Sequence, residues 1–241
     1  MNEVIRQLAE RKSVRSFTDR PIGQAEKQAI LRAAVEAPTA GNQQLYTILD
    51  ITDSAIKARL AETCDHQPMI AKAPMVLVFC ADCKKWYDAF RASDCAPRLP
   101  EVGDLMLAVC DTVIAAQNAV TAAQSLGIGS CYVGDVMENC AAQRALLHLP
   151  DYVFPAAMVI FGYPTDQQLA RPKPERAKME YIVHENGYHP LSPQALEEMW
   201  TPRAGSQDYR SYMQKFCDRK YNSAFSREMS RSVREYLSQF H

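Results

Sequence analysis

The sequence lacks the glycine-rich motifs with which many enzymes bind nucleotide phosphates. Neither G-x-G-x-x-G nor G-x-x-x-x-G-K-[ST] occurs in its 241 residues, so neither a Rossmann site nor a P-loop is supported. No run of 18 apolar residues is present, and the densest one, Met75–Phe79, has the length of a strand. Charged residues at Glu3, Arg6 and Glu10 interrupt any signal-peptide pattern. We therefore expect a soluble, cytoplasmic protein with no membrane partner.

An excess of charge is also missing, because the formal net charge is −1. The molecule as a whole is therefore not an electrostatic partner for nucleic acid or anionic lipid. One alternative stays open in the basic segment 203–241, where Arg227, Arg231 and Arg234 are spaced to share one face of a helix. Few aromatic residues lie between these arginines, so we expect no nucleic-acid partner.

Metal-ligand patterns are equally scarce. The pair Cys80-x-x-Cys83 has no second pair at zinc-finger spacing, and His66 stands at no recognised interval from it. No Ser/His/Asp triad can be assembled from the five histidines. The cysteine pair follows an apolar strand, where Cys80 would pack as a small hydrophobe, although a redox dithiol is an alternative. We expect no metal site.

The hydrophobic content of 47% suits one globular domain, or one domain with an appendage. Apolar periodicity predicts helices and strands in alternation, with an irregular stretch over 82–103 and a polar, basic region after residue 165. The predicted helix 104–126 is apolar nearly all round, which indicates a core shared between subunits. The other predicted helices are 24–37, 54–63 and 138–147, and the predicted strands are 46–51, 75–80, 130–135 (running into a turn) and 156–161.

A short basic segment, Arg11-Lys-Ser-Val-Arg15, follows the amphipathic opening of the chain. In an extended strand Arg11, Ser13 and Arg15 share a face. Two guanidinium groups and a hydroxyl group form a compact receptor for a phosphate or another planar anion. The alternative is an ordinary solvated basic stretch at a helix end.

Three further segments suit the same ligand. Pro38–Gln44 is rich in side-chain amides, and Ser130–Asp135 contains Gly134, which allows main-chain N–H groups to approach a ring closely. Lys173-Pro-Glu-Arg176 is a second small cationic cluster, held stiff by prolines. Each segment alone is also compatible with an ordinary turn or a solvated linker.

In their order and spacing these segments closely resemble the FMN-dependent nitroreductase family. Arg11–Arg15 and Ala37–Gln44 are similar to the opening of that family, and Gly127–Gly134 resembles its segment beside the flavin ring. Lys173–Arg176, followed by Ile182–Asn186, resembles the NADPH-linked nitroreductase and flavin reductase branch, which has a long basic C-terminal extension.

The resemblance implies an α+β fold of the α/β sandwich type. A central mixed, mostly antiparallel sheet would be flanked by helices, and the C-terminal extension would embrace the partner subunit of a homodimer. The FMN-binding core would cover residues 1–165, and residues 166–241 would form an extension of the same domain.

The resemblance also implies which residues contact FMN at the dimer interface. The phosphate would be held by Arg11, Ser13, Lys173 and Arg176, with Lys12 in the same segment. Arg15 would lie near the pyrimidine edge of the flavin. The remaining contacts would come from Gln67, from Tyr132, Val133, Gly134 and Asp135 beside N5, and from Pro38, Thr39 and Asn42 of the other subunit.

The implied activity is hydride transfer from NADPH or NADH through FMN to a nitroaromatic, a quinone or a related acceptor. Both substrates would use the same flavin face in turn, so the kinetics would be ping-pong, with no catalytic side chain. Arg203 in the basic extension is the candidate residue for binding the 2′-phosphate of NADPH. A flavin reductase and a non-catalytic flavin-binding protein are the alternative functions.

Overall fold

The computed structural model describes residues 1–240. The chain divides into two compact units. Unit 1 contains Met1–Arg171 together with the segment from Glu228 onward, and unit 2 contains Pro172–Arg227. Unit 1 is therefore discontinuous in the sequence.

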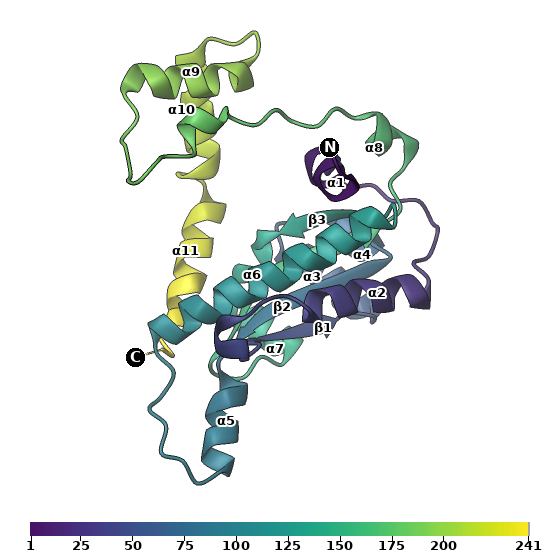
Figure 1. The fold of residues 1–241 in the computed structure, drawn as a ribbon, viewed down its shortest axis with the longest axis vertical. Coiled ribbons are helices and arrows are strands. Elements are labelled where there is room, and N and C mark those ends of the chain that lie inside the picture. Colours follow the sequence, from purple (N-terminus) through teal and green to yellow (C-terminus); the bar gives the residue numbers. More distant parts are fainter. Residues whose placement is uncertain (241) are drawn as a thin grey trace. The chain divides into compact units, whose positions relative to one another are not determined.

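Unit 1 is built on a four-stranded sheet (Figure 1). The strand order is β1-β2-β4-β3, and each neighbouring pair is antiparallel. Among residues 1–240, the one parallel bridge, between Ser13 and Ser130, lies outside these strands. The expected mostly antiparallel sheet is confirmed, although its four strands pair only antiparallel and the sheet is not mixed. The strands are β1 (Tyr46–Asp50), β2 (Met75–Asp82), β3 (Gly129–Val133) and β4 (Val153–Gly162).

Helices cover both faces of this sheet. Met75, Leu77 and Phe79 of β2 pack in one apolar cluster with α2 (Gln24–Val35) and α6 (Val102–Ser125). The alternate residues of β2 pack in a second cluster on the other face. That face is covered by α3 (Ser54–Thr63), α4 (Pro68–Lys72) and α7 (Cys140–Leu147). Because both faces are covered, every residue of β2 is buried.

The long helix α6 has two different faces. Its buried side packs on the sheet, whereas Met106, Cys110, Val113 and Ile114 are exposed at helical spacing. Among residues 1–240, α6 is the helix long and apolar enough to cross a membrane by length and composition. Since 44% of its most apolar stretch is buried inside the protein, we interpret α6 as a core helix with one uncovered apolar stripe.

The segment predicted to be irregular contains a helix, α5 (Lys84–Ala92). The carboxylate of Asp82 accepts hydrogen bonds from the main-chain N–H groups of Lys84 (3.0 Å) and Lys85 (3.1 Å). These bonds satisfy donors that the first turn of a helix leaves free. The prediction was wrong for residues 84–92 because this cap lies within the preceding strand rather than in a turn.

The remaining helices are short or belong to the C-terminal region. α11 (Ala224–Leu237) ends in unit 1, where Tyr236 packs edge-on against Phe154 with ring centroids 5.1 Å apart. Unit 2 contains η3 (Met179–Tyr181), α9 (Pro193–Ala204) and α10 (Tyr209–Lys220). Unit 1 also contains α1 (Glu3–Glu10), η1 (Ala40–Asn42), η2 (Gly134–Met137) and α8 (Asp166–Ala170).

Candidate functional site

The basic segment Arg11–Arg15 lies alongside β3. The N–H group of Val14 donates to the carbonyl oxygen of Ser130 at 2.9 Å. The Val14 side chain is buried against Gly129, where an added Cβ would lie only 2.6 Å from Val14 Cγ2. Gly129 is therefore required for this close approach. With Val14 buried at the sheet edge, residues 13 and 15 project to the other side, as the period of two predicts.

Arg11, Ser13 and Arg15 all act on one group of β3, the Cys131 thiol. Burial raises the pKa of the Cys131 thiol, while Arg15, Ser13 and Arg11 act in the opposite direction through charge and hydrogen bonding. All three side chains are therefore near one sulfur atom. The structure thus brings together two guanidinium groups and one hydroxyl group, an arrangement that can receive an anion.

One atom of this cluster has its hydrogen-bonding capacity unused. Arg11 Nη1 is buried and has no hydrogen-bond partner among residues 1–240. Buried polar groups normally have partners, since an unsatisfied donor costs about 1–3 kcal/mol. The position of Arg11 thus fits a bound anion such as the phosphate group of FMN.

Lys12 points away from this cluster and has a different partner. Its ammonium group donates to the carbonyl oxygen of Leu169 at 2.7 Å and to that of Arg171. The main-chain N–H group of Arg15 donates to Oε1 of Gln168 at 3.1 Å. Lys12 and Gln168 therefore fix α8, and Arg171 directly after it, to the basic segment. Sequence reasoning did not find Gln168.

The loop Pro38–Gln44 is held by a buried carboxylate from α6. Asp111 accepts hydrogen bonds from the N–H groups of Ala40 (2.9 Å) and Leu45 (3.3 Å). Thr39 Oγ1 accepts from the N–H group of Gln44 at 3.1 Å, and Asn42 has a left-handed φ of 55°. The loop is thus preformed, with Pro38 and Asn42 exposed. The sequence signal for Asp111 was a carboxylate in the middle of a helix that is apolar nearly all round.

The end of β3 presents a different surface. Tyr132 directs its hydroxyl group to Gln117 of α6 at 3.4 Å, and burial raises its pKa to about 12. Val133 is buried and Gly134 is exposed. A Cβ at Gly134 would meet only Met137 Cε, at 3.8 Å. The packing of the chain itself therefore does not demand glycine here, which leaves the main chain open to a ligand.

Gln67 and Asp135, two of the residues predicted to contact FMN, lie next to the end of β3. Gln67 is the residue before α4, and its side-chain amide donates to the carbonyl oxygen of Cys64 at 3.0 Å. Burial, followed by the charge of Asp135 in η2, raises the pKa of both Cys64 and Glu138. Gln67 and Asp135 thus have a common neighbour in Cys64.

The other predicted residues belong to unit 2. Arg176 and Arg203 line one cavity of about 730 Å³ in this unit, together with Trp200 and Tyr212. The guanidinium carbon of Arg203 lies 5.3 Å from the ring centroids of both Trp200 and Phe216. No carboxylate among residues 1–240 forms an ion pair with Arg203. Lys173 precedes this region in an irregular segment.

The Cys80-x-x-Cys83 pair does not form a redox centre in this structure. Both thiols are free and buried, and burial raises the pKa of each to about 12. Cys80 and Cys83 line two different cavities. Among residues 1–240 no group of three or more metal-binding side chains is present. We interpret Cys80 and Cys83 as packing residues.

The chain shares its fold with a class of solved α+β oxidoreductases. A solved member of this class is the NADPH:FMN oxidoreductase of Vibrio harveyi, determined in complex with NAD⁺. It shares 25% identity with this chain at a TM-score of 0.84, and the alignment covers 98% of each chain.

Sequence comparison gives the family. The FMN reductase [NAD(P)H] of Bacillus subtilis is 30% identical over 100% of this chain and 93% of its own length. The oxygen-insensitive NADPH nitroreductase of Salmonella typhimurium is 36% identical over 81% of this chain and 79% of its own length. The model of the Nitroreductase family matches residues 8–163. The chain belongs to the nitroreductase family.

Proposed function

We propose that this protein is an NAD(P)H-dependent FMN oxidoreductase that reduces nitroaromatic, quinone or related acceptors. The observation that carries the proposal is the buried, unpartnered Nη1 of Arg11 beside Ser13 and Arg15. Family membership supports FMN as the group that this cluster receives. The names of the relatives support NADPH or NADH as the donor. We expect the protein to be soluble and cytoplasmic.

In this proposal Arg11 and Ser13 bind the FMN phosphate, assisted by Lys173 and Arg176. Lys12 contributes by holding the carbonyl groups of Leu169 and Arg171, and so the chain that leads to Lys173. Further flavin contacts come from Arg15, Gln67, Tyr132, Val133, Gly134 and Asp135.

We further propose a homodimer in which Pro38, Thr39 and Asn42 contact the FMN of the partner subunit. The loop that carries them is preformed by Asp111 and exposes Pro38 and Asn42. The uncovered apolar stripe of α6 supports association with a second copy of the chain.

When bound, FMN supplies the site that takes a hydride from one substrate and passes it to the next. The residues of the chain hold and polarise that site. The guanidinium group of Arg15 would stabilise negative charge at the pyrimidine edge, and the open main chain at Gly134 would approach the flavin ring closely beside N5. Reduction of a nitro group to a nitroso group takes two electrons and two protons and releases water. NAD(P)H supplies the hydride and solvent supplies the second proton.

Arg203 supports NADPH as the donor. Its guanidinium group is exposed, lies between two aromatic rings and has no carboxylate partner among the described residues. A 2′-phosphate group would find there a cation that no ion pair neutralises. A flavin reductase is the second candidate function, favoured by the likeness to the Bacillus subtilis FMN reductase over the whole chain.

One experiment tests the proposal. We expect the purified protein to be yellow, to bind FMN without a covalent bond, and to lose its flavin absorbance when NADPH is added without oxygen. Arg11→Glu should raise the Kd for FMN by on the order of 10- to 100-fold, since a hydrogen bond to a charged group contributes about 1.5–3 kcal/mol.

Arg91→Glu, at an exposed arginine of α5, is the control and should leave the Kd for FMN unchanged. The kcat/KM values for NADPH and NADH, measured on the wild type and on Arg203→Ala, give the donor preference. A colourless protein that does not take up FMN would refute the proposed function. Equal FMN affinity in the Arg11 and Arg91 variants would place the phosphate elsewhere.

A further inference from the structure

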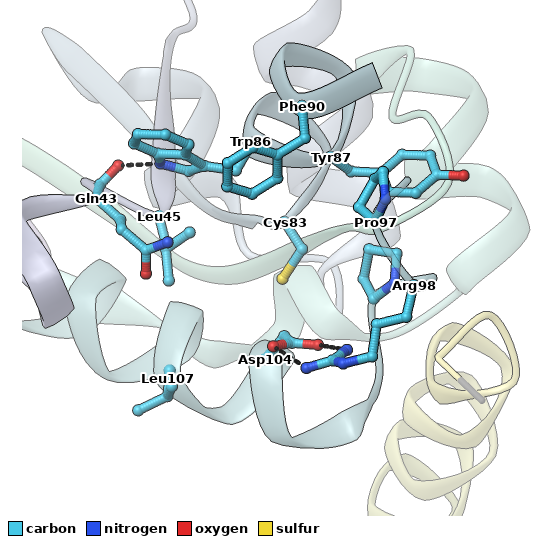
Figure 2. A pocket seen from close by; sticks show the side chains of 11 residues that line it. Gln43, Leu45, Cys83, Trp86, Tyr87, Phe90, Pro97, Arg98, Asp104 and Leu107 are labelled. Atoms are coloured by element: carbon cyan, nitrogen blue, oxygen red, sulfur yellow. Dashed lines mark hydrogen bonds and ion pairs between the residues drawn. The ribbon is translucent and has the colours of Figure 1, made fainter. Parts of the chain in front are cut away.

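A cavity of about 280 Å³ opens between α5 and the first turns of α6 (Figure 2). Aromatic rings form much of its wall, and none of the residues predicted to bind FMN or the donor lines it. Leu45 and Leu107 lie at its other side, and the thiol of Cys83 points into it. The aromatic residues are Trp86, Tyr87 and Phe90.

The aromatic wall is held in place before any ligand binds. The indole N–H group of Trp86 donates to the carbonyl oxygen of Gln43 at 2.7 Å, so the ring is fixed to the end of the loop Pro38–Gln44. Phe90 lies one helical turn further along, with its ring centroid 5.4 Å from that of Trp86. Fixed rings favour a planar ligand because little side-chain entropy is lost on binding.

The polar part of the wall carries no net charge. Arg98 and Asp104 form a bidentate ion pair with N–O distances of 2.5 and 3.0 Å, visible in Figure 2. The Cys83 thiol is neutral at physiological pH, because burial raises its pKa to about 12. A phosphate or carboxylate group would find no free cation here and would face the carboxylate of Asp104. The cavity therefore selects an uncharged ligand that can exchange hydrogen bonds with the ion pair.

Size restricts the ligand further. A cavity of about 150 Å³ is sufficient for benzene. The present volume of about 280 Å³ therefore accommodates one or two fused rings with small substituents. A cavity of about 280 Å³ does not accommodate the dinucleotide NADPH, nor the whole of FMN with its three-ring flavin and ribityl phosphate.

We propose that this cavity binds the ring of an uncharged aromatic electron acceptor. The inference rests on the proposed function, in which the loop Pro38–Gln44 contacts the FMN of the partner subunit. Gln43 belongs to that loop and lines the cavity. An acceptor ring held by Trp86 and Phe90 therefore lies beside the segment that reaches the flavin. Trp86, Phe90 and the Arg98–Asp104 pair then determine which acceptors are used.

The test separates the acceptor step from the donor step in the FMN-loaded dimer. The probes are 1,3-dinitrobenzene, which is neutral, and 3-nitrobenzenesulfonate, which is an anion of similar size. Phe90→Ala removes part of the wall, and Leu107→Trp fills the cavity from an exposed position of α6. Each variant should lower kcat/KM for 1,3-dinitrobenzene by about tenfold. The rate at which NADPH bleaches the flavin should stay within about twofold of the wild type.

Neutralising the carboxylate of Asp104 changes the preference between the two probes, which loss of packing alone would not change. Asp104→Asn removes the bidentate partner of Arg98 and leaves it, among residues 1–240, only the longer ion pair with Glu101, at 3.9 Å. The ratio of kcat/KM for the anionic probe to that for the neutral probe should therefore rise about tenfold. The control is Tyr188→Ala, which truncates an aromatic residue that is 85% exposed. This variant should leave kcat/KM for both probes unchanged.

The outcomes distinguish the two proposals. If the wild type holds no FMN or is not bleached by NADPH, the proposed function fails. If the wild type is bleached but kinetics with both probes are unchanged in the Phe90, Leu107 and Asp104 variants, the acceptor binds elsewhere and this inference is overturned. If the Phe90→Ala variant loses its flavin, the Leu107→Trp and Asp104→Asn variants decide whether the cavity binds the acceptor.

Discussion

Two carboxyl groups beside η2 have opposite properties although they are neighbours. Glu138 is only 4% exposed. Burial, followed by the charges of Asp135, Asp65 and Glu228, raises its pKa to about 7. Glu228 accepts hydrogen bonds from Arg231 and Ser232, and these lower its pKa to about 2. Near neutral pH one carboxyl group is therefore partly protonated while the other is fully ionised.

The raised pKa of Glu138 makes a prediction about stability. The folded protein binds this proton more tightly than the unfolded chain, so the free energy of unfolding falls as the pH rises from about 4.5 to about 7. Glu138→Gln removes the titration. Holoprotein unfolding in urea, at fixed protein and FMN concentrations, should show the variant more stable than the wild type at pH 8, by up to about 3 kcal/mol. At pH 4 the two should be similar.

Glu228→Gln is the matched comparison and should have the opposite effect. Its carboxylate stabilises the fold above pH 4.5, and that stabilisation is lost as the pH falls toward 2. At pH 8 this variant should be less stable than the wild type. A Glu138→Gln protein that is no more stable than the wild type at pH 8 would show that burial does not destabilise the wild-type carboxylate.

Residue-level prediction from the sequence succeeded where a contact follows from local periodicity. The shared face of Arg11, Ser13 and Arg15 needed only the period of a strand, and the three side chains do lie around one thiol. Gln168 and Asp111 could not be found in this way. They lie 153 and 71 residues from their main-chain partners at Arg15 and Ala40. Such contacts depend on the tertiary fold.

At the scale of elements, the loop Pro38–Gln44 depends on one side chain of α6. Asp111→Ala would leave the buried N–H group of Leu45 and that of Ala40 without their acceptor. The free energy of unfolding should fall by about 1–3 kcal/mol. Asp111→Asn, which keeps one acceptor oxygen, should have an intermediate effect.

Urea unfolding measures both Asp111 variants. Asp88→Asn is the control because Asp88 pairs with Lys84 on the surface of α5, where such a pair contributes less than about 1 kcal/mol. An Asp111→Ala protein as stable as the Asp88 control would mean that the loop is held by other contacts. In that case limited proteolysis within residues 38–44 should also be unchanged.

A helix or strand could be predicted from the sequence where its capping residue and its apolar spacing lie within or next to the element itself. The helix predicted over 54–63 has those bounds in the structure, because Asp53 caps its first turn and the apolar spacing is regular. α5 was missed, because prolines at 97 and 100 and the strand-borne cap made the whole stretch 82–103 resemble a loop. The sheet order β1-β2-β4-β3 was not predicted, since strand pairing is a long-range property, and the family resemblance implied only a mostly antiparallel sheet flanked by helices.

At the scale of the whole molecule, the exposed stripe of α6 predicts association. Ile114 is 39% exposed although it lies midway along an otherwise core helix. Ile114→Glu would place a charge in the proposed homodimer interface and should convert the dimer to a monomer with weakened FMN binding. Sedimentation velocity and flavin absorbance measure the two effects.

Ile114→Val keeps the stripe apolar and should remain a yellow dimer, which makes it the matched control. A dimer that persists in Ile114→Glu would show that the subunits associate through another surface. A wild-type protein that sediments as a monomer while holding FMN would refute the two-subunit site.

The discontinuity of unit 1 has a consequence for synthesis of the protein. Tyr236 and Phe240 are buried in a cluster with Leu45, Ala81 and Phe154, yet they leave the ribosome after all of unit 2. The nascent chain must therefore carry an incomplete core throughout translation of residues 172–227. During that interval the apolar surface that Tyr236 and Phe240 later cover is open to chaperones and proteases. A chain that stops before Tyr236 would accordingly keep this surface uncovered, and cellular quality control could recognise it there.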